Sequence, residues 1–278
     1  MRALINITDF QEAYDILAGS KYYYEIMNNI NRYIRNIKTV NDLENLLSKN
    51  PYILSHGKKV EKLSFDISES LGLDSKQKDI IRISARYHDS AFIFFPQEFQ
   101  STLNLHNESQ LQALLAHPYI SAELVGALFS SKEIFSTILS HHEFNSGCGY
   151  PYKLKSENIS IESSIIGIVD FYLTLTEEHQ FFNSLPIEEV IMYLDEKVNI
   201  LFSEEIFYAF LATIRKELKH EEIHFVEIDR KITKWREKFN NKSKRNTKNI
   251  KKNNLPTSFE NTLKNISKED KFIQRSII

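Results

Sequence analysis

The chain has 278 residues, of which 42% are hydrophobic and 12% aromatic, so it can bury a core and is not a wholly disordered protein. Only 7 glycines and 6 prolines are present, too few for the many tight turns of an all-β sandwich or barrel. The net charge of −2 gives no overall attraction to DNA, so no DNA partner is expected. The single cysteine, Cys148, excludes an internal disulfide and a cysteine-based zinc cluster.

The N-terminal segment MRALINITDFQEAYD contains an acidic residue and no long apolar run, unlike a signal peptide. No later segment reaches the roughly 20 apolar residues that a membrane-spanning helix needs. We therefore expect a cytoplasmic protein without a membrane span.

Hydrophobic periodicity predicts an all-α bundle of roughly eight to ten helices in three parts. Residues 1–45 form a small N-terminal helical region, which could be a degraded sensor, a dimerisation surface or part of the bundle. Residues 46–228 form the main domain and contain all 9 histidines. Residues 229–278 form a basic tail, partly flexible, in which a solvated extension is commoner than a contact to anionic lipid or nucleic acid.

Helices of the main domain are recognised by apolar stripes, caps and breakers. Proline disfavours helical geometry at the residue before it, so His117 is expected at a break between helices and not inside one. The predicted helices are His56–Leu71, Ile80–Asp89, one that starts at the capping box Asn107–Gln110 and meets Pro118, Ile134–His142, Ser160–Leu175, Ile187–Leu201 and Glu204–Leu218.

Imidazole and carboxylate side chains stand on or beside these helices in five separate segments. Singly, each is more commonly a structural residue. Asp170, however, lies in an apolar stretch with no basic residue near it in sequence, and burying an unpaired carboxylate costs several kcal/mol. The adjacent His141 and His142 would point about 100° apart on a helix and suit two metals, or one metal and a substrate. The candidate metal ligands are His56, His88, Asp89, His117, His141, His142 and Asp170.

Seven ligands are too many for one metal ion and suit two. Because histidine and aspartate are mixed and no cysteine takes part, iron or manganese is favoured, with zinc possible. The order of these residues, followed by a Gly-Tyr-Pro motif, resembles the HD-GYP family, a bacterial branch of the HD-domain metal-dependent phosphohydrolases. The matching segments, within roughly residues 52 to 215, are SHGKKV, YHDSAF, AHPYI, SHHEFNSGCGYP, IIGIVDFYLTLT and the closing LFSEEIFYAFL.

The resemblance implies an all-α domain that hydrolyses cyclic di-GMP, a bacterial second messenger, to a linear dinucleotide. It makes the seven candidates the ligands of two divalent metal ions, with His88 and Asp89 catalytic and Asp89 bridging the ions. Two metals suit this reaction because they acidify a shared water, neutralise the phosphate and align the attack. Tyr150 would contact the guanine-bearing part of the nucleotide, and Gly149, like Gly147, would let the backbone approach the ligand.

Four positions depart from the family pattern. Phe92 stands where a lysine usually contacts the scissile phosphate, and Leu173 and His179 stand where an Asp and a nucleotide-binding Arg are usual. His179 is kept as a substrate-binding candidate, although histidine is cationic only when protonated. Losing a charged hydrogen bond to an anion costs about 1.5–3 kcal/mol, so weakened or retuned activity is expected. Tyr52 replaces the glutamate that holds a third metal in some members, so two metals are expected.

Two alternatives remain open at this stage. The chain could be a weakened module that binds cyclic di-GMP or a protein partner as an effector, or a phosphohydrolase for another nucleotide. A protein partner or a homodimer could form through the N-terminal helices. Glu143 could orient an imidazole or be a plain surface residue, and Cys148 is expected to be structural. The remaining histidines, His106, His220 and His224, are expected to face solvent.

Overall fold

A computed structural model of the chain describes residues 15–96, 99, 107–178, 183–217, 230–234 and 272. The predicted all-α class is confirmed, since these residues form helices joined by turns and two isolated β-bridges. None of the described helices combines the length and the apolar character needed to cross a bilayer. The expected cytoplasmic location stays a prediction.

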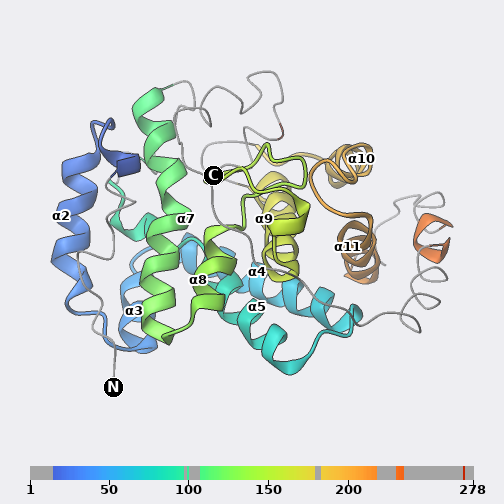
Figure 1. The fold of residues 1–278 in the computed structure, drawn as a ribbon, viewed down its shortest axis with the longest axis horizontal. Helices are drawn as coiled ribbons and strands as arrows, with labels where there is room; N and C mark the ends of the chain where they lie inside the picture. The colour runs from blue at the N-terminus through green and yellow to red at the C-terminus, as the bar shows by residue number, and fades with distance from the viewer. Residues whose placement is uncertain are drawn as a thin grey trace.

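The helices follow one another with short connections, and Figure 1 places the N-terminal helices with α7 on one side of the molecule and α10 and α11 on the other. In chain order they are α2 (Tyr23–Ile34), α3 (Val40–Leu47), α4 (Pro51–Ser70), α5 (Ser75–Tyr87), the 3₁₀ helix η2 (Ser90–Phe94), α7 (Glu108–Phe129), α8 (Lys132–Leu139), the 3₁₀ helix η3 (Ser156–Asn158), α9 (Ile161–Thr176), α10 (Ile187–Glu196) and α11 (Glu204–Glu217).

Caps explain where several helices begin. Asn50 accepts hydrogen bonds from the first backbone amides of α4, and Pro51 suits the first helical position, so α4 begins five residues before the predicted start. Asp74 forms a capping box with Gln77, which likewise starts α5 earlier than its apolar stripe indicated. Asn107 caps α7 at the predicted start by accepting a hydrogen bond from the Gln110 amide, and Ser160, predicted as the first residue of its helix, is the cap of α9.

Buried apolar residues form two clusters that share α4. The first cluster joins α2 and α3 to η2, α7 and α8, and the second joins α9, α10 and α11 to the later parts of α4 and to α5. Ile53 belongs to the first cluster and Val60 to the second, and His56 lies between them on the same helix. The seam between the two cores therefore contains polar side chains. The N-terminal helices pack as part of the bundle here, and the three-part division of the chain stays a prediction.

The expected break at His117 is wrong, because α7 continues through Pro118. Proline lacks an N–H and so cannot bond the carbonyl of Leu114, four residues before it. The His117 ring nitrogen Nδ1 lies 2.6 Å from that carbonyl oxygen and takes the place of the missing donor. Residues on both sides of Pro118 are buried, so packing holds the helix together across the proline.

Two glycines allow unusually close approaches beside the seam. A Cβ added at Gly57 would lie 2.2 Å from the Arg86 carbonyl oxygen, which sets the spacing of α4 and α5. A Cβ at Gly167 would lie 2.4 Å from the His141 carbonyl oxygen, where α9 passes the segment after α8. Contacts this short exclude any side chain, so both positions favour glycine.

Only a few residues of the basic tail are described. Ile232 and Phe272 are buried in the second cluster, and the Phe272 ring stacks on Tyr193 with centroids 4.1 Å apart. The predictions for the rest of the tail lie outside the described residues, as do those for His106, His179, His220 and His224.

Candidate metal centre

The seven predicted metal ligands come together at the seam between the two apolar clusters. They form two groups, and within each group one ligand atom per residue lies within 4.8 Å of the others. All seven side chains are buried. The first group is His56, His88, Asp89 and Asp170, and the second is His117, His141 and His142.

The first group is built by α4, the end of α5 and the middle of α9. The Oδ1 atom of Asp170 lies 2.9 Å from His56 Nε2 and 3.3 Å from His88 Nε2. The Asp89 Oδ2 atom lies 3.2 Å from the same nitrogen of His88. Thr174, one turn after Asp170, donates its hydroxyl to Asp170 Oδ1 over 3.3 Å. The group thus concentrates two carboxylates and two imidazoles in a space without bulk water.

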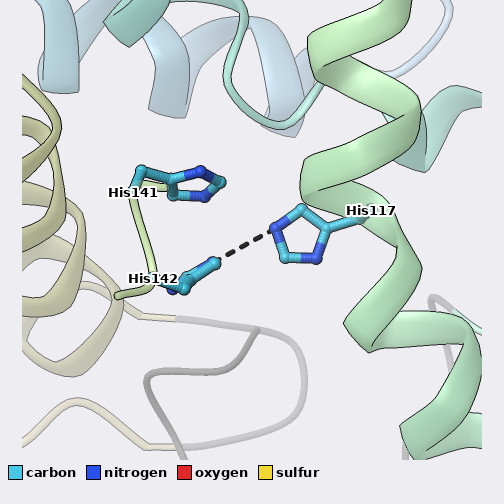
Figure 2. Close-up of side chains that lie close together, drawn as sticks. All are labelled: His117, His141 and His142. Carbon is cyan, nitrogen blue, oxygen red and sulfur yellow. Dashed lines mark hydrogen bonds between the residues drawn. The ribbon is translucent and has the colours of Figure 1, made fainter. Parts of the chain in front are cut away.

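In the second group, His117 on α7 faces two histidines in the segment after α8, as Figure 2 shows. The Nε2 atoms of His117 and His142 are 3.1 Å apart. Because α8 ends at Leu139, His141 and His142 lie in a turn and not on the predicted helix. Their ring centroids are 4.0 Å apart, and both face the same space. This geometry does not require them to serve different ions.

Both carboxylates reach across to the second group. The Asp89 Oδ1 atom lies 3.4 Å from His117 Nε2, while its other oxygen faces His88. Asp170 Oδ2 lies 4.0 Å from His142 Nε2. This is the arrangement that a bridging carboxylate requires, although the role of Asp89 as a bridge stays a prediction.

Three of the five imidazoles are oriented by the same kind of hydrogen bond. In His88, His117 and His141 the Nδ1 atom faces a backbone carbonyl oxygen, and since a carbonyl can only accept, Nδ1 carries the proton. In the neutral form of each ring, Nε2 is unprotonated and points into the centre, as in metal-binding histidines. His141 Nε2 is buried and has no hydrogen-bond partner among the described residues, which fits a site for a cation.

Burial keeps the second group neutral. Desolvation lowers the pKa of His141 to about 3, and the neighbouring imidazoles of His88 and His117 act in the same direction. Burial and the neighbouring His141 and His117 hold the pKa of His142 well below its usual range, and burial lowers the pKa of His117 despite Asp89. Neutral imidazoles have the lone pairs that metal coordination uses.

The first group is held by charge pairing. Burial opposes a proton on His88, but Asp89 and Asp170 outweigh it and raise the pKa of His88 well above its usual value. Burial likewise opposes the ionised form of Asp170, and hydrogen bonds with His56 and His88 outweigh it to hold that pKa well below its usual range. In the described part of the chain, the two carboxylates form ion pairs only with histidines. The donor set therefore suits divalent cations.

Comparison with known proteins identifies the fold of this centre. The profile of the HD domain family matches residues 41–200, more than half of the chain, and includes all seven side chains. The chain belongs to the HD domain family. HD domain phosphohydrolases bind divalent metals, and the two groups could hold such ions. The assignment of single residues as ligands stays a prediction.

Several curated relatives resemble this HD domain. A cyclic di-GMP phosphodiesterase of Borreliella burgdorferi, PdeB, is 32% identical over 155 residues, which are 54% of this chain and 41% of the relative. A cyclic di-GMP phosphodiesterase of Thermotoga maritima is 26% identical over 167 residues, 59% of this chain and 45% of the relative. A 3'3'-cGAMP-specific phosphodiesterase of Vibrio cholerae is 25% identical over 152 residues, which are 55% of this chain and 35% of the relative. The family match and these relatives confirm the resemblance to the HD-GYP family. The chain spans less than half the length of each.

The Gly-Tyr-Pro loop of this HD domain lies directly on the second group. The ring of Tyr150 stacks on His142 with centroids 4.7 Å apart and is only 2% exposed. In this conformation it offers little surface to a nucleotide, and its role as a guanine contact stays a prediction. Gly149 faces the protein's own backbone, because a Cβ there would lie 2.4 Å from the His142 carbonyl oxygen. The predicted ligand approach at Gly149 likewise stays a prediction.

Glu143 holds the same loop from inside. Its carboxylate is 2% exposed and accepts hydrogen bonds from the backbone amides of Tyr152, at 2.6 Å, and Leu154, at 2.9 Å. Burial raises the pKa of Glu143 to about 7, although these amides lower it. Neither sequence-based expectation describes this residue, since the described contacts of Glu143 are with the loop and not with an imidazole or solvent. Glutamates after histidine pairs carry no distinctive sequence signal for such a role.

Aromatic rings replace charge at the edges of the centre. Phe92 stacks on His117 with ring centroids 4.7 Å apart, and Tyr52 stacks on His56 at 5.9 Å. Leu173 packs against the second apolar cluster. None of these three side chains can supply the positive charge that a phosphate contact requires.

Replacing Glu143 with glutamine should destabilise the folded HD domain. The glutamine side chain has one oxygen, so it can accept only one of the two backbone hydrogen bonds. Its NH₂ group would face the other backbone N–H, and two donors cannot bond each other. We expect the free energy of unfolding to fall by about 1–3 kcal/mol, the cost of an unsatisfied buried polar group. Urea denaturation followed by circular dichroism measures this. The exposed Glu157→Gln in the same segment is the control, and equal stability of the two variants would contradict the role of Glu143.

Proposed function

We propose that this HD domain is a metal-dependent phosphodiesterase that opens cyclic di-GMP to a linear dinucleotide. The observation that carries the proposal is the placement of two ligand groups side by side, with Asp89 and Asp170 reaching both. Three similar proteins are named as phosphodiesterases of cyclic di-GMP or 3'3'-cGAMP, which supports a cyclic dinucleotide substrate.

The residues of the centre fit two divalent cations, iron or manganese before zinc, because the donors are imidazoles and carboxylates without a thiolate. Bound there, the ions would supply an acidified water as nucleophile and neutralise the phosphate charge. Carbonyl-bound Nδ1 atoms keep His88, His117 and His141 in the orientation that this binding needs. Asp89 and Asp170 supply the negative charge that balances the cations, and the buried surroundings exclude bulk water.

The phenylalanine at position 92, where the family usually has a lysine, favours a second candidate, a slow enzyme that mainly binds its dinucleotide. Phe92 occupies the place of the usual phosphate-binding lysine and lies against His117. Phe92 carries no charge, so at this position nothing would assist the metal ions in balancing the charge of the phosphate. A dimer or protein partner through the N-terminal helices also stays a prediction. On α2, Tyr24 is 77% exposed and would be available for such a contact.

Turnover of cyclic di-GMP by the full chain loaded with Mn²⁺ or Fe²⁺ tests the proposal. We expect Asp89→Asn to lower kcat by at least about 100-fold, because the loss of one electrostatic contact to a transition state typically has an effect of this size. Chromatography of the linear product measures the rate. The control is Asp79→Asn, which changes an exposed carboxylate on α5. A folded, metal-loaded wild-type chain without turnover would overturn the phosphodiesterase assignment.

Restoring a cation at position 92 should separate a weakened enzyme from a pure binding module. A charged hydrogen bond to an anion contributes about 1.5–3 kcal/mol, so Phe92→Lys should raise kcat/KM for cyclic di-GMP about 10-fold or more. Phe92→Leu is the matched control because it removes the ring without adding charge. Tight binding of the dinucleotide without any gain in turnover by Phe92→Lys would favour the binding module.

A further inference from the structure

The hydrogen bonds that orient three imidazoles share one feature of the helix backbone. Each ring donates Nδ1–H to the carbonyl of the residue three positions earlier, over 2.5–2.8 Å. Inside a helix that carbonyl is normally occupied by the amide four residues further along. A carbonyl oxygen can accept two hydrogen bonds, but where that amide is missing the imidazole can occupy the position that the amide would otherwise take. The donor and acceptor pairs are His88 with Ala85, His117 with Leu114 and His141 with Ile138.

Two of these carbonyls lie at the end of a helix. Ala85 lies in the last turn of α5, which ends at Tyr87, and Ile138 lies in the last turn of α8, which ends at Leu139. The last carbonyl groups of a helix have no regular intrahelical partner. The histidines that follow these two helix ends find acceptors beside them, and the Ile138 carbonyl also accepts the backbone amides of Ser140 and His141.

Leu114 is different because it lies within the continuous helix α7. The residue four positions further along is Pro118, which has no N–H. We infer that Pro118 is a positioning residue, which keeps the Leu114 carbonyl available so that His117 directs its Nε2 atom into the metal centre. That atom lies 3.1 Å from His142 Nε2 and 3.4 Å from Asp89 Oδ1. The inference rests on the proposed function only in taking His117 as a metal ligand.

The fold by itself gives little reason for a proline here. Proline is the least favourable residue inside a helix, and α7 continues on both sides of it. Pro118 is buried, so its ring also fills space in the core. A role confined to packing predicts that any side chain of similar volume would serve. A role in positioning predicts that an N–H at position 118 is harmful whatever the side chain.

The variants Pro118→Ala and Pro118→Val both introduce that N–H, and Val retains most of the apolar volume. In the metal-free full chain, NMR of ¹⁵N-histidine should show His117 shifting from the Nδ1–H tautomer toward a mixture, with the signal assigned through His117→Gln. Titration with Mn²⁺ should show about 10- to 100-fold weaker binding at one site. Metal affinity typically falls by this factor when the hydrogen-bond partner of a metal ligand is removed. The circular dichroism spectra of both variants should still be those of a helical protein.

Val125→Ala is the matched control, because it removes two buried carbon atoms from the same helix and leaves position 118 unchanged. It should lower the melting temperature while keeping the wild-type tautomer and Mn²⁺ affinity. Wild-type tautomer and affinity in Pro118→Ala and Pro118→Val would overturn the inference, as would failure of both to fold, which would show a packing role. Neither readout uses a nucleotide, so a failed phosphodiesterase assay would not be mistaken for failure of this inference.

Discussion

Two buried carboxylates impose the main constraint on this fold. Asp89 and Asp170 lie at the seam of two apolar clusters, where an unpaired charge would cost several kcal/mol. Within the described residues their ion pairs are with imidazoles, and the two carboxylates raise the pKa of His88. The remaining negative charge is what divalent cations would balance. The seam is therefore organised around charge that the protein alone compensates only in part.

Backbone geometry brings these groups together from five segments. Gly57 lets α4 approach α5, and Gly167 lets α9 approach the turn that holds His141. Carbonyls in the last turns of α5 and α8 orient the neighbouring imidazoles. Within α7 the same effect comes from a proline. Different local structures thus produce one common orientation of the ring nitrogens.

The sequence was sufficient to predict the helical class, most helices and the set of side chains that converge, because ligand-type residues in five apolar segments, in the order of a known family, indicate one site although each alone is more commonly structural. It was insufficient where two local effects compete. Proline next to His117 predicted a break, but packing on both sides of α7 outweighs the lost backbone bond. Stripes of apolar residues did not show that α8 stops before His141. The bonds from Glu143 to the Gly-Tyr-Pro loop depend on tertiary folding, which no local pattern reveals.

The central claim is that imidazoles and carboxylates from distant parts of the chain hold a pair of cations. Anomalous X-ray diffraction from crystals of the full chain loaded with Mn²⁺ tests it most directly. The account predicts two anomalous peaks, one among His56, His88, Asp89 and Asp170 and the other among His117, His141 and His142. Folded protein with saturating Mn²⁺ and no peak at either group would contradict it.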